Sequence, residues 1–316
     1  MTFFSDKEHF NNKEQMTELI PINVWNGIAI CVNTLIHNNN LAKDYPSKCL
    51  DGNGICGVDE KSFYVSAKSL IPTIEFLPQY GGDIEPLSNN YLDPNPFEQT
   101  EEVGKKRKQF MYNVLDFVEF VFAHICDVQN GKYHEFYHHY ELIFVNTTKA
   151  KEKFVNDVNE IFSRNNIAFK LCDNGQIQRI LNEQLNNLIN TVNEPKEKIL
   201  NDLLKLATEK IKSPKIEERR IALEKLWDAY ERIKTVINPN NKQCSSNELI
   251  EKVSKGNVSM KEVLIEECKM LNKIGNEYFQ IRHSEMNKTP IDEVEHIDYL
   301  FFRMYSIINL LLNNIE

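Results

Sequence analysis

The residues best suited to chemistry lie in the segment IGNEYFQIRHSE, near the C-terminal end of the chain. If this segment is helical, Asn276 and His283 are seven positions apart and share one face, while Arg282 faces Glu285. An arginine can hold a phosphate group while a neighbouring histidine exchanges a proton near neutral pH. The spacing therefore indicates a candidate site for chemistry on phosphates.

The same residues also fit a structural role. Arg282 could form an ion pair with Asp298, and His283 could cap backbone carbonyls where Pro290 ends the helix. On chemistry alone we favour this structural interpretation, and both remain open.

Three histidines form a second candidate group in the aromatic segment GKYHEFYHHYELIFV. His134 and His138 would share one face of a helix, as metal ligands do, and also one face of a strand. A metal hydrolase could combine them with His139 and an acidic residue such as Asp116. No HExxH motif accompanies them, so packing among aromatic residues is the plainer explanation.

The seven cysteines are scattered along the chain, and an odd number makes a poor disulfide framework. We expect free thiols in a reducing compartment. Cys49 and Cys56 could supply half of a zinc site, but they lack the CxxC spacing and no matching pair follows. We therefore predict no metal and no cofactor.

Composition indicates a folded protein: of 316 residues, 41% are hydrophobic and 26% are charged. The net charge of −9 argues against coating nucleic acid through overall charge, although a local site remains possible. We interpret the basic run Lys105–Lys108 as a solvated helix start rather than a phosphate-binding patch. The sequence contains no signal peptide and no membrane-spanning segment, so we expect a cytoplasmic protein without a membrane partner.

Hydrophobic spacing predicts a mainly α protein. In the N-terminal half it predicts an amphipathic helix from Glu18 to His37 and a central helix from Phe110 to Ile125. Breaker residues from Pro78 to Pro96 predict a long surface loop. Alternating residues around Asn174 and Gly175 predict a small β-hairpin at about residues 167–181.

The C-terminal part is helical almost throughout. Four amphipathic helices are expected: one over Lys198–Ile211, one after Pro214, one from about Ser259, and a final one that should be the most buried. We therefore predict a helical domain over residues 1–148, a helix and hairpin connector over residues 149–193, and a four-helix bundle over residues 194–316.

Several stretches of the chain resemble AbiJ-type abortive-infection proteins of bacteria. They are FFSDKE and PINVWNGI near the start, then FVNDVNEIFSRNNIAFKLCDNGQIQRI, ALEKLWDAYERIKT, IGNEYFQIRHSE and HIDYLFFRMYSII. The resemblance covers nearly the whole chain. It implies an AbiJ-like N-terminal domain and a role in phage defence, with an unknown phage or host trigger.

The resemblance further implies that the C-terminal bundle is HEPN-like. Domains of this kind are often metal-independent ribonucleases that act as dimers, with an Arg followed a few residues later by a His. Here the motif is incomplete. If Arg282 is the arginine of the motif, the histidine expected after it is missing, because positions 287–289 hold Asn, Lys and Thr. If His283 is instead the catalytic histidine, Asn276 stands where Arg is expected.

Two hypotheses follow. In the first, the protein is an antiphage effector that binds or cuts RNA as a homodimer: His283 transfers a proton, Arg282 holds the scissile phosphate, and Asn276 and Glu285 orient them. In the second, the protein is a non-enzymatic sensor. Its N-terminal domain, which contains Trp25, recognises a phage or host component, and the bundle only dimerises.

Overall fold

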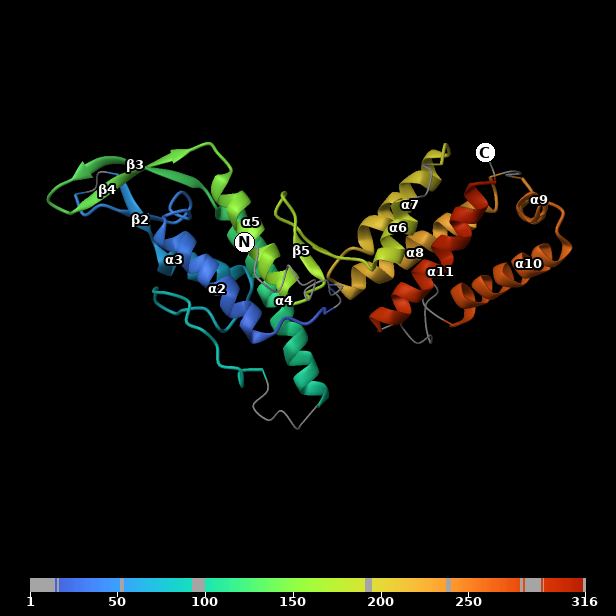
Figure 1. Ribbon diagram of the computed structural model, residues 1–316, viewed down its shortest axis with the longest axis horizontal. Helices are drawn as coiled ribbons and strands as arrows, with labels where there is room; N and C mark the ends of the chain where they lie inside the picture. Colours follow the sequence, from blue (N-terminus) through green and yellow to red (C-terminus); the bar gives the residue numbers. More distant parts are fainter. Residues whose placement is uncertain are drawn as a thin grey trace, which may run out of the picture. The chain divides into compact units, whose positions relative to one another are not determined.

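The computed structural model describes residues 15, 17–51, 54–92, 100–190, 195–236, 240–278, 281, 291 and 293–314. These residues are mainly α-helical with small antiparallel hairpins, which confirms the predicted fold class (Figure 1). The chain divides into two compact units, Met1–Ile180 and Leu181–Glu316, and each unit has its own hydrophobic core.

The described part of the first unit is built on four helices. They are α2 (Ile22–His37), α3 (Glu60–Leu70), α4 (Glu101–His124) and α5 (Lys149–Arg164). Helix α2 begins later than predicted because Pro21, which has extended backbone angles, occupies its N-cap position. Asp59 and Thr100 cap α3 and α4 by accepting hydrogen bonds from backbone amides of the first turn.

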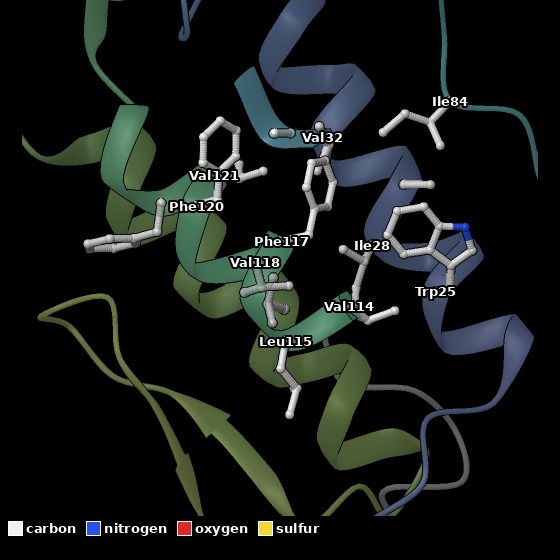
Figure 2. Packing of buried hydrophobic residues seen from close by; sticks show 14 of the residues in the cluster. Trp25, Ile28, Val32, Ile84, Val114, Leu115, Phe117, Val118, Phe120 and Val121 are labelled. Atoms are coloured by element: carbon white, nitrogen blue, oxygen red, sulfur yellow. The ribbon is translucent and has the colours of Figure 1, made fainter. Parts of the chain in front are cut away.

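Helix α4 is the centre of this core, as the abundance of Phe and Val from Phe110 onward predicts. Phe117, Val118 and Val121 are fully buried, and Phe117 and Val121 lie toward side chains of α2 in Figure 2. The ring of Phe117 lies 5.8 Å from the ring of Trp25 and 6.1 Å from that of Phe63. Such tilted aromatic contacts add to the free energy gained by burial.

Two asparagines of α2 hold the long loop that precedes α4. Asn33 accepts a hydrogen bond from the Ile84 amide at 2.9 Å and donates one to its carbonyl at 3.2 Å. Asn26 makes the same pair of bonds with Leu87, at 2.8 and 3.0 Å. The described residues of the loop form no helix or strand, as predicted. The two asparagine side chains bond to N–H and C=O groups of the loop backbone, as a neighbouring strand would.

Three two-stranded antiparallel hairpins complete the unit. They are β1 (Pro46–Lys48) with β2 (Ile55–Val58), β3 (Asp127–His134) with β4 (His139–Val145), and β5 (Phe169–Leu171) with β6 (Ile177–Arg179). The β5–β6 pair confirms the predicted hairpin, and the aromatic histidine segment is extended. Because Phe169, Leu171 and Ile177 are buried in the core that α4 centres, this hairpin belongs to the first unit. The three-part division predicted from the sequence stays a proposal.

The basic run Lys105–Lys108 lies near the start of α4, as predicted. Lys105 pairs with Glu101 at 2.6 Å, one turn earlier, and Lys106 donates to the Tyr91 carbonyl at 2.7 Å. These exposed contacts are worth little individually, and they suit a solvated helix start.

The second unit is helical in all its described elements. They are α6 (Glu183–Asn190), α7 (Lys198–Lys210), α8 (Ile216–Ile233), α9 (Lys242–Ser254), α10 (Val258–Lys273), the π-helical turn η1 (Ile274–Tyr278) and α11 (Val294–Leu312). The four predicted helices are present as α7, α8, α10 and α11, with α6 before them and α9 between α8 and α10. Helix α11 buries residues along its whole length, among them Ile297, Phe301 and Ile308.

None of the helices in the described part of the chain is long and apolar enough to span a lipid bilayer.

The turn between β5 and β6 generates a prediction about stability. Gly175 has a φ of +88°, and a Cβ atom there would lie 2.3 Å from a ring carbon of Phe122. Gly175→Ala combines left-handed strain with overpacking, so we expect the free energy of unfolding to fall by about 2–4 kcal/mol. Urea denaturation followed by circular dichroism measures this.

Gly104→Ala is the matched control. Gly104 lies within α4, and a Cβ atom there would meet nothing within 4 Å. Because alanine favours a helix over glycine, we expect this variant to gain about 0.5–1 kcal/mol. Equal effects of the two substitutions would contradict the assigned turn.

Candidate functional site

The predicted chemical segment begins at a break in helix geometry. Helix α10 is regular up to Lys273, and Ile274–Tyr278 then form the π-helical turn η1. Asn276 lies on this turn and is exposed. A π turn is wider than an α turn, so the predicted alignment of Asn276 with His283 does not carry over from a regular helix. Arg282, His283 and Glu285 lie outside the described residues.

Close contact between Gly275 and Trp227 accompanies the π turn. A Cβ atom on Gly275 would lie 2.4 Å from the Cη2 and Cζ3 atoms of the Trp227 ring. The ring is 1% exposed, and among the described residues its Nε1 atom has no hydrogen-bond partner. Only glycine allows the indole to approach the helix backbone this closely. Isolated π turns occur often at functional sites, which makes this the structural feature to test.

A buried lysine lies beneath the same region. Lys234 is 6% exposed, pairs with Glu231, and donates a hydrogen bond to Asn272 at 2.9 Å. Its ammonium group also lies 4.1 Å from the centre of the Tyr230 ring. Burial raises the pKa of Tyr230 well above its usual range, so its phenol stays neutral. These groups satisfy one another within the core of the second unit.

Helices α10 and α11 flank the segment that contains Arg282 and His283, and a salt bridge joins them. The guanidinium of Arg303 makes two bonds of 2.8 Å to the carboxylate of Glu267. This pairing raises the pKa of Arg303 and keeps it charged. The bidentate salt bridge therefore links α10, which precedes the segment, to α11, which follows it.

Buried isoleucines stand at both ends of residues 282–290. Ile281 is 3% exposed and Ile291 is 7% exposed. In addition, Arg220 of α8 donates a hydrogen bond of 2.8 Å to the Ile291 carbonyl. The chain is thus held in the core directly before Arg282 and directly after Pro290.

The histidine group is arranged differently from its prediction. His134 and His139 face each other across the β3–β4 hairpin, whereas His138 has a φ of +54° and contacts Tyr133 through its Nδ1 atom at 3.5 Å. Asp116 is exposed on α4. The structure does not bring His138 and Asp116 into the group.

Cys49 joins the two histidines instead. Its Sγ atom lies 3.7 Å from Nδ1 of His134, although the residues are 85 positions apart. Burial raises the pKa of the Cys49 thiol, so the free thiol is protonated at neutral pH and is a poor nucleophile. Sequence reasoning paired Cys49 with Cys56 because only nearby residues can be matched by spacing.

Comparison with known proteins identifies one family. The family model described as AbiJ N-terminal domain 4 matches residues 2–194. No curated protein and no solved structure gives a match.

The π turn can be tested through Gly275. In Gly275→Ala the added methyl group overlaps the Trp227 ring, so we expect a loss of about 1–3 kcal/mol in stability. In a Trp25→Phe background, Trp227 is the only tryptophan, and its emission should shift as the ring moves. Asn276→Ala, an exposed change on the same turn, serves as the control and should leave the emission unchanged. An unaltered Trp227 spectrum in Gly275→Ala would contradict the contact.

Proposed function

The chain belongs to the AbiJ N-terminal domain 4 family, and from this premise we propose that it is a bacterial abortive-infection effector whose C-terminal unit acts on RNA. The family match carries the defence role, because the matched residues make up more than half of the chain. The C-terminal unit lies almost wholly beyond the matched residues. We assign the action on RNA to this unit and take it to be a HEPN-like helical domain.

The chemical argument rests on the segment from Asn276 to Glu285. In the proposed reaction His283 transfers a proton, Arg282 holds the scissile phosphate, and Asn276 and Glu285 orient these two groups. An RNA chain carries its own nucleophile in the 2′-hydroxyl, so this reaction needs proton transfer and charge stabilisation but no metal ion. A homodimer would place two such segments at one groove.

Features of the described residues support a functional segment at this position. The π turn ends the regular part of α10 and carries Asn276, and Ile281 and Ile291 are buried directly before and after residues 282–290. A catalytic segment held at both ends by a rigid scaffold is a common arrangement in enzymes.

A second function is favoured by exposed apolar side chains of the same unit. Val263 and Met270 of α10 are 59% and 44% exposed, and Tyr299 and Phe302 of α11 are 59% and 40% exposed. Apolar residues that gather on a surface often mark protein contacts. In this alternative the bundle only dimerises, and the N-terminal unit senses a phage or host component.

The RNA hypothesis is tested in bacteria that express the wild type, His283→Ala or Arg282→Ala, with and without phage. Loss of a general acid–base group costs about 10²–10⁴-fold in rate. We therefore expect wild type to arrest growth with RNA fragmentation and both variants to lose these effects. The measurements are growth curves and the integrity of total RNA.

His296→Ala is the matched control, because His296 is an exposed histidine of α11 in the same unit. It should behave as wild type. If His283→Ala remains folded by circular dichroism and still fragments RNA and arrests growth, the assignment of His283 is wrong. If no protein fragments RNA while defence persists, the non-enzymatic alternative gains support.

Sedimentation of the purified chain tests the dimer that the non-enzymatic alternative requires. Val263 and Met270, seven residues apart, share one side of α10, so Val263→Asp combined with Met270→Lys should convert a dimer into a monomer. Val258→Asp, five residues earlier and on a different side of the helix, should leave the dimer intact. A wild type that sediments as a monomer would rule out dimerisation through this face.

A further inference from the structure

A cysteine and two histidines converge in the first unit, in a place that the defence role does not explain. Cys49 lies between β1 and β2, and His134 and His139 belong to the β3–β4 hairpin. Sγ of Cys49 and one ring nitrogen of each histidine all lie within 4.8 Å of one another. We propose that these three residues, together with Asp51, form a zinc site that fastens the β1–β2 loop to the β3–β4 hairpin.

The donor spacing suits a tetrahedral ion. Zinc binds sulfur at about 2.3 Å and imidazole nitrogen at about 2.0–2.1 Å, so two donors of one ion lie about 3.5 Å apart. Sγ of Cys49 and Nδ1 of His134 are 3.7 Å apart. One ring nitrogen of His139 lies within 4.8 Å of both of these atoms, which places the third donor beside the same position.

The hairpin itself brings the histidines together. His134 and His139 are register partners at the end of the β3–β4 ladder, and their ring centroids are 5.3 Å apart. The turn between them closes through His138, whose left-handed backbone leaves its own ring outside the donor group. The hairpin backbone therefore sets the distance between the two imidazoles before any ion binds.

His139 adds evidence of a ligand. Its Nε2 atom is buried, and among the described residues it has no hydrogen-bond partner. An unpaired buried polar atom is costly, because it loses its contact with water and gains nothing in return. Ligation through Nε2 would remove that cost.

Glu141 occupies the position of an outer support for His134. Its Oε1 atom lies 2.9 Å from Nε2 of His134, opposite the nitrogen that faces Cys49. A carboxylate that accepts from one ring nitrogen fixes the proton there and leaves the other nitrogen free to bind metal. Gly54 makes room for this side chain, since a Cβ atom there would lie 3.0 Å from Cγ of Glu141.

Asp51 supplies the fourth donor. Its Oδ2 atom lies 3.6 Å from Nδ1 of His134, on the side that faces Cys49. A set of one thiolate, two imidazoles and one carboxylate favours zinc over magnesium or calcium, which prefer oxygen ligands alone. Binding of the ion displaces the proton of the Cys49 thiol.

The ion would hold the β3–β4 hairpin in place, which packing alone does not do. No residue of β3 or β4 is buried, and an isolated two-stranded hairpin is only marginally stable in water. The strands β2 and β4 lie side by side, as Figure 1 shows, so a bridge between their loops holds the hairpin in place. The hairpin carries exposed aromatic residues, among them Phe136, which is 85% exposed.

The test is metal analysis of the purified full chain by mass spectrometry. We expect one zinc ion per chain in the wild type, and loss of zinc in Cys49→Ser and in His139→Ala. Replacement of zinc by cobalt should give the thiolate-to-cobalt charge-transfer band in the wild type and remove it in Cys49→Ser. A chelator should lower the melting temperature of the wild type and leave that of Cys49→Ser unchanged.

His138→Asn is the matched control, because it alters a histidine of the same turn that lies outside the donor group and asparagine tolerates the left-handed backbone. It should retain one zinc ion. The proposal is overturned if the wild type holds no zinc and shows no charge-transfer band with cobalt, or if both donor variants retain zinc. The cobalt spectrum of the wild type decides the matter even where a variant fails to fold, and no readout depends on defence activity.

Discussion

Helix α4 carries phenylalanine and valine around most of its circumference, and such a surface cannot face water. Other elements of the first unit must therefore cover it. Helix α2 covers it through Trp25 and Ile28, α3 through Phe63, and α5 through Phe154. The β5–β6 hairpin closes a further side, where Gly175 lies against Phe122. Each of these elements buries apolar side chains in the core that α4 centres, so the unit forms as a whole around one helix.

Sequence periodicity was sufficient for the elements that bury a regular stripe. It predicted the central helix, the hairpin at Asn174 and Gly175, and the four main helices of the second unit, because burial repeats at the helical or strand period. It failed where structure depends on a contact between distant residues. The π turn at Ile274 accompanies the close contact between Trp227 and Gly275. No local pattern in the sequence reveals which ring will approach which glycine.

The two candidate sites show the same distinction. Asn276 could be placed by sequence on the end of a core helix, and the structure places it there, although on a wider turn. The Cys49 group was not predictable, because its members come from two hairpins separated by α3 and α4. Cysteine spacing along the chain carries information only when the ligands share one loop. Here the hairpin register creates the pair of histidines, and the packing of β2 on β4 brings the cysteine to them.

The two hydrophobic cores share no residue: one extends from Ile20 to Ile177, and the other from Leu181 to Leu312. A genetic crossover between Ile180 and Leu181 would therefore leave both cores complete. Recombination at this point can attach the first unit to a different helical partner while each unit keeps its own hydrophobic core. Lineages that carry this chain can thus exchange one half of the protein while selection preserves the other.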